Sequence, residues 1–457
     1  MMVICWLLNI VYAMIMVLLS PWMLYRMIAQ GRYRQGWKDR FGFVTRRYSQ
    51  QPCIWIHAVS MGEINAIGTM VRQLERVLPQ YEIVISSTTD TGMACARKLY
   101  GTTHRIFFFP WDFSCAVRRT FRRIRPELCI LMELEVWHNF TALAERFSIP
   151  VIVANGRISS GKGFPRYRRI APLVRPMFAR LALVLAQDDQ YAQRFRFLGV
   201  PSERVQVVGS LKYDTAQPGV EVPGARELAV RLRLDRQPLI WVAGSTGPGE
   251  EEIILESFEQ LRCTAGLERL RLIIVPRKPE RFDTVARLIE SHGHRLLRYS
   301  DVKADSYHPD AADDTAVILG DTMGDLRKFY YLADVIFVGR SLIPMGGSDM
   351  MEAALGPAVV VGPHTENFQQ TVTALCRAKA MEIARNAGEL TEITRRLLQD
   401  RDDAKQMGQR ARQVIIDNQG ATRRSVAAIA ELLGYRMPRR EGGIAQLIVD
   451  PTGSMRQ

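Results

Sequence analysis

The stretch at residues 54–66, IWIHAVSMGEINA, decides the fold. Residues 54–59 form the short apolar run of a buried strand, and Ser60-Met61-Gly62 predicts a tight turn. From Glu63 onward apolar side chains recur at the spacing of a helix, at Ile64, Ile67, Met70, Val71 and Leu74. A strand that runs into a helix is the unit of a parallel α/β sheet, in which ligands bind at the carboxyl ends of strands. Glu63 is therefore either a charge that begins a helix or a working base.

The same alternation of strands and helices fills two halves of the chain. Strand-like runs lie at 53–59, 82–88, 105–109, 127–132, 150–154 and 182–187, and then at 238–243, 270–275, 315–318, 334–338 and 358–361. Short apolar strands that alternate with helices predict parallel sheets built from βαβ units. We therefore expect α/β domains at 26–215 and 226–435, joined by a linker at 216–225 that is rich in Pro and Gly. The last stretch, 436–457, lacks a core pattern and is expected to form a loose tail.

The first 25 residues, MMVICWLLNIVYAMIMVLLSPWMLY, carry no charge. Roughly 20 apolar residues suffice to span a bilayer, and the run lacks the basic start of a signal peptide. Positive charges follow it, at Arg26, Arg32, Arg34, Lys38 and Arg40, so the positive-inside rule leaves the remaining chain in the cytoplasm. We expect residues 1–25 to be a membrane anchor, with a buried core helix as the alternative.

The chain is basic, with a formal net charge of +14. Lys and Arg cluster at 26–47, at 118–125 and at 157–180, and such surfaces suit nucleic acid, anionic lipid or a phosphorylated substrate. Nucleic acid is the least favoured partner, because no motif of stacking aromatic residues accompanies these clusters. The seven scattered cysteines include no C-x-x-C pair, which favours a reducing compartment without a disulfide framework or zinc site.

Two turns of the second half have residue types that suit anions. In VAGSTGPGEEEII, at 242–254, glycines and hydroxyls lie between a strand and a helix, where backbone amides can hold a phosphate. The alternative is an ordinary turn in which Ser245 or Thr246 caps the helix. In IIVPRKPERF, at 273–282, Arg277 follows a strand, and its guanidinium suits a phosphate or carboxylate as well as a surface ion pair.

A third segment lies at 337–368, FVGRSLIPMGGSDMMEAALGPAVVVGPHTENF. Its strand runs into Gly346-Gly347, and Glu352 follows near the start of an expected helix. A carboxylate at that place can accept hydrogen bonds from a ribose diol, or it can simply favour the positive end of the helix dipole.

The order of these motifs resembles the Kdo transferase family, in which Kdo is 3-deoxy-D-manno-oct-2-ulosonic acid. The resemblance extends from the anchor to about residue 430. The matching blocks are GRYRQGWKDRFG (31–42), HAVSMGE (57–63), SSTTDTG (86–92), FFPWD (108–112), MELEVWHN (132–139), QDDQYAQRFRFLGV (187–200), VVGSLKYD (207–214), AGSTGPGEE (243–251), PRKPERF (276–282), LGDTMGDL (319–326) and GPHTENF (362–368).

The resemblance implies a fold, a reaction and a set of residues. The fold would be α/β with two Rossmann-like domains facing a cleft, the GT-B glycosyltransferase architecture, behind an N-terminal membrane-anchor helix. The reaction would transfer Kdo from CMP-Kdo to lipid IVA, with inversion, on the cytoplasmic face of the inner membrane. The catalytic positions fall on Glu63 as general base and on Glu133 and Lys212 as groups that stabilise the transition state. The CMP contacts fall on Pro276, Arg277, Met323, Gly324, Asp325, Asp349, Met350, Met351 and Glu352. We expect no cofactor or metal, because no acidic D-x-D cluster offers itself at these positions.

This chain also departs from the family pattern beside the expected donor. Where the family usually has G-G-H-N-P-L-E-P, residues 346–353 are GGSDMMEA, so Ser348 and Asp349 replace a His-Asn pair. Leu134, His138 and Lys278 also differ from the usual residues. An acidic side chain near a phosphate repels it unless it is protonated, turned away or paired with a cation. The alternatives are therefore a glycosyltransferase of the same fold that uses another nucleotide sugar, and a catalytically dead relative that binds lipid or assists assembly.

Overall fold

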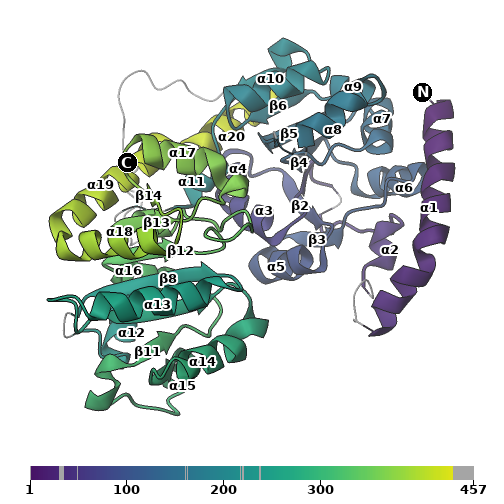
Figure 1. Ribbon diagram of the computed structural model, residues 1–457. Helices are drawn as coiled ribbons and strands as arrows, with labels where there is room; N and C mark the ends of the chain where they lie inside the picture. The colour runs from purple at the N-terminus through teal and green to yellow at the C-terminus, as the bar shows by residue number, and fades with distance from the viewer. Residues whose placement is uncertain are drawn as a thin grey trace. The chain divides into compact units, whose positions relative to one another are not determined.

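The computed structural model describes residues 2–435 except 30–34, 49, 160, 162, 217, 219–220 and 236–237. The described chain forms two compact units (Figure 1). The first contains the residues up to Val208 and those from Thr422 onward, and the second contains Gly209–Ala421.

The first unit is built on a parallel sheet of seven strands. Their order is β3-β2-β1-β4-β5-β6-β7, so the chain order reverses between β1 and β4. The strands are β1 (Cys53–His57), β2 (Glu82–Ser87), β3 (Arg105–Phe108), β4 (Leu128–Met132), β5 (Val151–Gly156), β6 (Leu183–Ala186) and β7 (Val205–Val207). Trp55 in β1 lies at the centre of the core, where its ring packs against Phe107 and Phe140, each with a centroid distance of 5.3 Å. Strands that are buried on both faces explain the continuous apolar runs in the sequence.

Helices cover the first sheet and precede it. They are α1 (Met2–Ala29), α2 (Trp37–Arg40), α3 (Met61–Ala66), α4 (Gly68–Val77), α5 (Asp90–Tyr100), α6 (Ser114–Ile124), α7 (His138–Arg146), α8 (Gly163–Arg169), α9 (Ala171–Ala179), α10 (Asp189–Phe197), the 3₁₀ turn η1 (Ser202–Arg204) and α20 (Ala421–Leu432). The amphipathic pattern predicted after Glu63 is present as two consecutive helices, α3 and α4.

The second unit repeats the scheme with another seven-stranded parallel sheet. Its order is β10-β11-β9-β8-β12-β13-β14, and the reversal lies between β8 and β12. The strands are β8 (Ile240–Thr246), β9 (Arg271–Pro276), β10 (Leu296–Arg298), β11 (Val317–Leu319), β12 (Val335–Val338), β13 (Ala358–Val361) and β14 (Glu382–Ile383). The predicted α/β fold class is confirmed by these two sheets.

The helices of the second unit include the strongly charged segment that follows residue 380. They are α11 (Leu211–Thr215), α12 (Ala225–Arg231), α13 (Glu250–Arg262), η2 (Pro279–Arg281), α14 (Phe282–Ser291), α15 (Tyr299–Lys303), η3 (Ala311–Thr315), α16 (Leu326–Leu332), η4 (Ala353–Leu355), η5 (Glu366–Phe368), α17 (Gln369–Arg377), α18 (Ala387–Gln399) and α19 (Arg401–Asp417).

The units divide the chain differently from the predicted domains. The chain enters the second unit at Gly209, ahead of the linker expected at 216–225, of which residues 217, 219 and 220 lie outside the described residues. From Thr422 it rejoins the first unit, whereas the predicted second domain runs to residue 435. Thr422 Oγ1 lies 3.1 Å from Thr69 Oγ1, and Arg424 Nε donates to Val208 O at 2.8 Å. A helical pattern predicts a helix but not the sheet on which it packs. The predicted tail, 436–457, lies outside the described residues.

Helix α1 corresponds to the predicted anchor and continues past residue 25. A span of 26 residues, Ile4–Ala29, is long and apolar enough to cross a membrane, with a mean hydropathy of 2.1. Length and composition therefore fit a membrane-associated helix.

Candidate active site

The predicted residues of the first unit meet at the point where its strand order reverses. Glu63 lies in the first turn of α3, which follows β1, and Glu133 comes directly after β4. These strands pair with each other, with Trp55 opposite Cys129. In open α/β sheets, ligands bind beyond the carboxyl ends of the two strands at this reversal. The topology thus places both glutamates where a ligand is expected.

Glu63 forms a capping box with Ser60. Ser60 Oγ accepts the Glu63 backbone N–H at 3.3 Å, and it also donates to Glu63 Oε1 at 2.8 Å. The other carboxylate oxygen, Oε2, accepts the Val59 N–H at 2.9 Å. This is the S-x-x-E signature of a helix start. Glu63 therefore begins its helix, and the same contacts hold its carboxylate in one orientation at the end of β1.

Burial and neighbouring carboxylates raise the pKa values of two glutamates at this edge of the sheet. Burial raises the pKa of Glu63, and the charge of Glu133 raises it further, while hydrogen bonds from Val59 and Ser60 oppose the change. Burial, with the charge of Glu63, also raises the pKa of Glu135 to about 7. Glu135 Oε2 accepts the indole N–H of Trp137 at 3.3 Å. Three glutamates thus gather here, and a base with a raised pKa is suited to take a proton near neutral pH.

Two residues at the carboxyl ends of β4 and β5 have a strained backbone conformation. Glu133 has a φ of 55°, and Asn155, near the end of the neighbouring strand β5, also has a φ of 55°. Non-glycine residues in this left-handed region cost about 1–3 kcal/mol each and cluster at functional sites. Glu133 is held by backbone hydrogen bonds from its N–H to Ala154 O at 3.0 Å and from Arg157 N–H to its own carbonyl at 3.3 Å. Its carboxylate also lies 3.9 Å from Arg157 Nε.

In the second unit two buried glutamates organise the turns after β8, β9 and β12. Glu250 and Glu251 begin α13, and both are fully buried. Glu250 accepts four backbone N–H groups, which belong to Gly247 (2.9 Å), Arg340 (2.5 Å), Ser341 (2.8 Å) and Leu342 (2.9 Å). Because its amide donates to Glu250, Gly247 serves the fold, although the sequence suggested a phosphate cradle in this turn.

Glu251 extends the same arrangement to the PRKPERF block. It accepts the Thr246 hydroxyl at 2.8 Å and both Nη atoms of Arg281, one of them at 3.0 Å. Thr246 therefore serves Glu251 and does not cap the helix, whose N-cap is Gly249. Bidentate guanidinium–carboxylate pairs fix geometry strongly, so the turns after β8 and β9 are held together.

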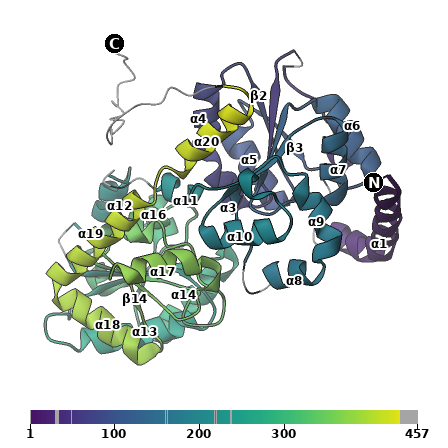
Figure 2. The same ribbon diagram turned by 90° about the horizontal axis from the view of Figure 1, so that it is seen from above.

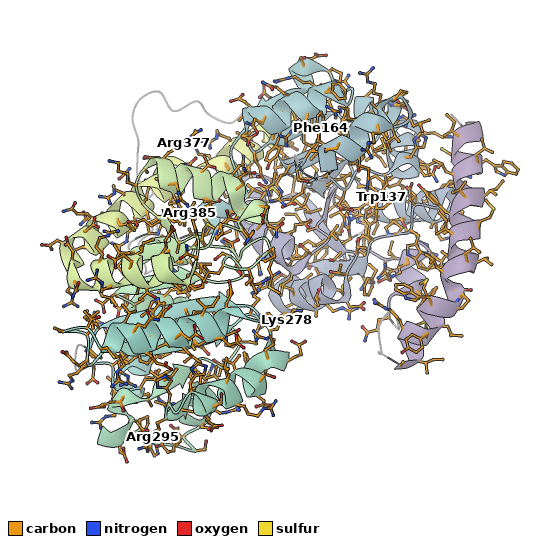
Figure 3. The ribbon with its side chains drawn as sticks, in the orientation of Figure 1. Trp137, Phe164, Lys278, Arg295, Arg377 and Arg385 are labelled. Atoms are coloured by element: carbon orange, nitrogen blue, oxygen red, sulfur yellow. The ribbon has the colours of Figure 1, made fainter. Side chains whose placement is uncertain are left out.

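The next predicted CMP contacts lie at the end of β9 and in the block 323–325, and they differ in whether their side chains are free to meet a ligand. Pro276 ends β9, and the Arg277 N–H donates to Thr246 O at 3.1 Å while the side chain is exposed. Lys278, also exposed, follows at the same edge (Figure 3). In the other block Met323 is exposed and Gly324 has a φ of 95°.

Asp325 is committed to neighbouring side chains. It accepts hydrogen bonds from Lys303 at 2.5 Å and Thr322 at 2.7 Å, and Lys328 lies 2.8 Å away. Burial favours its neutral form, but these partners outweigh burial and lower the pKa of Asp325 to about 2. The ionised Asp325 carboxylate, held by two lysines, therefore fixes the loop that carries Met323 and Gly324.

The last predicted group brings Lys212 and Asp349 together. Lys212 lies in α11, and its Nζ is 3.8 Å from Asp349 Oδ2 and 5.1 Å from the centroid of the Phe368 ring. Met350 and Met351 are buried core residues. Glu352 is exposed, yet desolvation by the surrounding protein raises its pKa, with Arg327 opposing the change and Asp349 adding to it.

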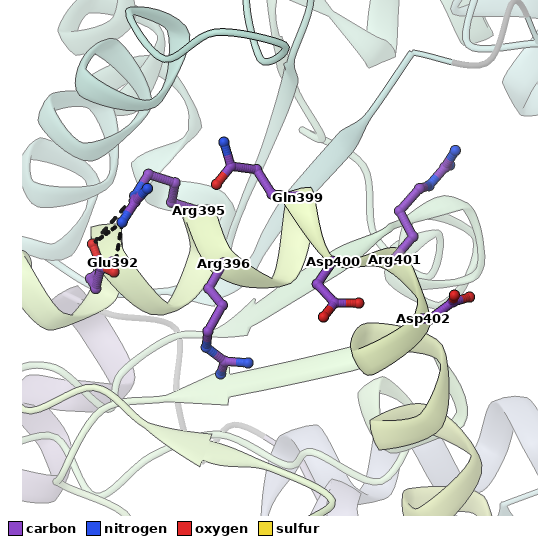
Figure 4. A pocket seen from close by; sticks show the side chains of 7 residues that line it. All are labelled: Glu392, Arg395, Arg396, Gln399, Asp400, Arg401 and Asp402. Carbon is purple, nitrogen blue, oxygen red and sulfur yellow. Dashed lines mark hydrogen bonds and ion pairs between the residues drawn. The ribbon is translucent and has the colours of Figure 1, made fainter.

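A pocket of about 630 Å³ lies at the junction of α18 and α19, and none of the predicted site residues lines it (Figure 4). Its cations are already paired, Arg395 with Glu392 at 2.7 Å and Arg401 with Asp334 at 2.9 Å. Asp400 caps α19 by accepting the Asp403 N–H at 3.0 Å. Within the described residues no group of three or more His, Cys, Asp or Glu side chains could hold a metal ion; metal independence of the reaction remains a prediction.

Sequence reasoning missed several residues of these sites. Glu135, Glu250, Glu251 and Arg157 lie in or beside quoted blocks, but their roles depend on which strand ends become neighbours. One local signal was present, because Ser60-x-x-Glu63 is a recognisable capping box. The left-handed conformation of Glu133 has no signal in the residue type.

Comparison with known proteins agrees with this geometry. The family model described as 3-deoxy-D-manno-octulosonic-acid transferase matches residues 35–215. The 3-deoxy-D-manno-octulosonic acid transferase of Haemophilus influenzae is 33% identical, covering 86% of this chain and 90% of its own. That of Bordetella pertussis is also 33% identical, over 83% and 87%. A glycosyltransferase structure from Rickettsia africae, 13% identical, covers 84% of this chain and 99% of its own with a TM-score of 0.57, which shows the GT-B fold alone. This chain belongs to the 3-deoxy-D-manno-octulosonic acid transferase family.

Proposed function

We propose that this Kdo glycosyltransferase of lipopolysaccharide synthesis transfers Kdo from CMP-Kdo to lipid IVA, or to a similar lipid A precursor, with inversion and without a metal. Family membership supports the sugar and the transfer. The observation on which the mechanism rests is the Glu63 carboxylate, which is oriented by Ser60 and Val59 and has a raised pKa at the end of β1.

In the proposed reaction Glu63 takes the proton of an acceptor hydroxyl. The acceptor oxygen forms a bond to the anomeric carbon of Kdo as the bond from that carbon to the CMP phosphate oxygen breaks. Attack opposite the leaving group inverts the configuration. The phosphate keeps the bonding electrons, and Lys212 and Arg277 stabilise the charge that develops on it.

The donor would be held by strand ends of the second unit. The exposed Arg277 follows β9, and Lys212 lies beside Asp349 in the loop after β12. Glu352 would accept hydrogen bonds from the ribose hydroxyls. Pro276 and the Met323–Asp325 block would contribute backbone contacts, because Asp325 is already occupied by two lysines.

The acceptor would be a lipid on the cytoplasmic face of the inner membrane. Helix α1 has the length and hydropathy of a membrane helix, and basic residues near an anionic surface gain roughly 1 kcal/mol each. The proposed partners are therefore CMP-Kdo, a phosphorylated lipid A precursor and anionic lipid.

A second candidate function follows from Asp349. It stands beside Lys212 where the family has an uncharged residue, so the donor could be another nucleotide sugar on the same fold. A catalytically dead, lipid-binding relative is disfavoured because Glu63, Lys212 and Arg277 are all present.

The test uses membranes that contain the full-length protein, CMP-Kdo and lipid IVA, with Glu63→Gln as the matched variant. We expect transfer by the wild type, loss of it in Glu63→Gln, an inverted anomeric centre by NMR, and unchanged rates in EDTA. Absence of transfer by folded wild-type protein, beside a working family enzyme, would refute the proposal for this pair of substrates. Activity with another nucleotide sugar in the same assay would then establish the second candidate.

A further inference from the structure

Polar side chains near the start of α1 dock the helix onto the first unit. Asn9 Nδ2 donates to Ser114 Oγ at 2.6 Å, and Asn9 Oδ1 accepts the Ser114 N–H at 3.0 Å and Asn139 Nδ2 at 3.2 Å. The Tyr12 hydroxyl donates to Asp112 Oδ2 at 3.2 Å. Asparagine and tyrosine in an otherwise apolar helix are therefore explained by specific partners on the globular unit.

The docking site is a rigid part of that unit. Burial raises the pKa of Asp112 to about 7, and its carboxylate accepts the N–H groups of Asn139 at 3.0 Å and Phe140 at 2.8 Å, which belong to the first turn of α7. Asn139 Nδ2 also donates to Asp112 O at 2.6 Å. Ser114 is the first residue of α6. Helix α1 is thus held to the starts of two helices that pack on the first sheet.

The contact is centred on the first half of α1, where the Tyr12 ring also meets Phe113 edge to face at a centroid distance of 6.0 Å. Partly covered residues of α1 are Cys5, Leu8, Asn9, Tyr12 and Met16, and, after an exposed stretch at 17–22, Met23, Arg26 and Met27. The remaining surface is apolar and exposed; Trp6 is 64%, Val17 71% and Leu18 77% exposed. From Cys5 to Met16 the covered positions have the spacing of a helix face that packs against its neighbour. Figures 1 and 2 both show α1 beside α6.

A pocket lined by arginines begins one residue beyond the docking point. Its volume is about 350 Å³, and it is lined by Cys115, Arg118, Arg119, Arg122 and Arg123 of α6. Arg119 donates to Phe41 O at 2.6 Å and stacks over Phe43. No carboxylate is found in an ion pair with these four arginines among the described residues. Arginines that gather in a recess without a carboxylate partner suit phosphate groups.

These contacts decide the orientation of α1 relative to a bilayer. If α1 crossed the membrane upright while docked, Asn9 and Tyr12 would lie within the hydrocarbon, and the start of α6 with its arginines would be drawn in beside them. An arginine at the bilayer centre costs roughly 2.5–3.5 kcal/mol even on insertion scales. We propose that α1 lies in the plane of the membrane interface, with its exposed apolar face in lipid, its polar stripe on the first unit, and the α6 arginines at anionic lipid headgroups.

Aromatic spacing alone would allow a spanning helix. Trp6 and Trp22 are 16 residues apart, about 24 Å along a helix, so they could mark both interfaces of a bilayer. The docking of Asn9 and Tyr12 onto the first unit is what argues against this arrangement. When α1 lies in the plane of the membrane interface, as proposed, Trp6 and Trp22 lie at the same interface.

The inference rests on the membrane association in the proposed function, but its test is independent of the sugar transferred. The full-length chain with Cys5→Ser and Cys115→Ser receives Asn9→Cys and Ser114→Cys, and membranes are treated with a mild oxidant. We expect an intramolecular disulfide, seen as a reversible gel shift. The matched control pairs Ser114→Cys with Val11→Cys, which is on the exposed face, and should not cross-link.

Topology is measured on the same protein with a cysteine added before Met1. A membrane-impermeant maleimide is applied to spheroplasts and to inverted vesicles, and labelled peptides are identified by mass spectrometry. We expect the added cysteine to be labelled only in inverted vesicles, as the exposed Cys263 should be. Labelling in spheroplasts would overturn the proposal, and so would failure of the Asn9–Ser114 pair to cross-link. Loss of Kdo transfer with this topology intact would refute the proposed function alone.

Discussion

The Lys212 ammonium lies 3.8 Å from the Asp349 carboxylate, so the acidic residue that departs from the family pattern pairs with a cation predicted to act in catalysis. An acid beside a donor phosphate is tolerated when a cation offsets its charge. Both side chains are partly exposed, so the pair is weak and a phosphate can compete for the lysine.

Replacing Asp349 with Asn should therefore improve donor binding. Exposed ion pairs contribute about 0.2–1 kcal/mol, and release of Lys212 should lower the KM for CMP-Kdo by up to about fivefold. Initial rates at varied CMP-Kdo measure this, with Glu392→Gln as a charge-matched control elsewhere in the second unit. A higher KM would mean instead that Asp349 holds Lys212 in place.

Glu63→Gln should distinguish the role of Glu63 as a general base from its role in the helix cap. Gln can replace Glu in a capping box, so the thermal midpoint should change little, whereas kcat should fall by about 10²–10⁴-fold because proton removal is lost. Ser60→Ala is the converse variant: it should lose about 1 kcal/mol of stability and only part of the activity, because the Val59 N–H still holds the Glu63 carboxylate. Equal loss of activity in both would show that only the cap matters.

The acid limb of the pH–rate profile should respond to Glu133. Its negative charge adds to the rise in the pKa of Glu63, so Glu133→Gln should lower that pKa and leave Glu63 ionised at lower pH. The acid limb of the kcat/KM profile should move to lower pH, whether or not kcat changes. Glu145→Gln, an exposed change on α7, should leave the limb in place.

Glu135 should make stability depend on pH. Its pKa is raised to about 7 in the folded chain and is about 4.3 when unfolded, so folding favours its protonated form. The penalty for ionising it is absent below the unfolded value, grows as pH rises, and is complete above pH 7. Glu135→Gln should thus stabilise the protein by about 1 kcal/mol at pH 8, after allowance for solvent screening, and hardly at pH 4. Thermal unfolding at the two pH values checks this.

Glu250→Gln should destabilise the turns after β8 and β12, where the sugar donor is proposed to bind, and with them the fold as a whole. A glutamine places one N–H₂ group among four backbone donors, and hydrogen bonds to a charged group contribute about 1.5–3 kcal/mol each. We expect roughly 3 kcal/mol of lost stability in denaturant unfolding and a higher KM for CMP-Kdo. Glu256→Gln, exposed on the same helix, is the control. Unchanged stability would show that the turns hold without this carboxylate.

The apolar runs of the sequence were enough to predict the central strands, because these are buried on both faces. Three strands escaped prediction: β7, β10 and β14. Each has two or three residues and lies at the edge of its sheet, where one side has no partner strand and side chains are partly exposed. Such short segments have no periodicity to read.

By itself the sequence determined the two α/β sheets, the apolar first helix, and the positions of Glu63, Lys212 and Arg277 at strand or helix ends, since these depend on local pattern and motif order. Tertiary structure alone decided that Glu133 raises the pKa of Glu63 and that Glu63 raises the pKa of Glu135. It also decided that Asp349 meets Lys212 and that α1 docks through Asn9 and Tyr12. Those contacts join residues far apart in the chain, and their energies depend on burial and distance, which no local pattern encodes.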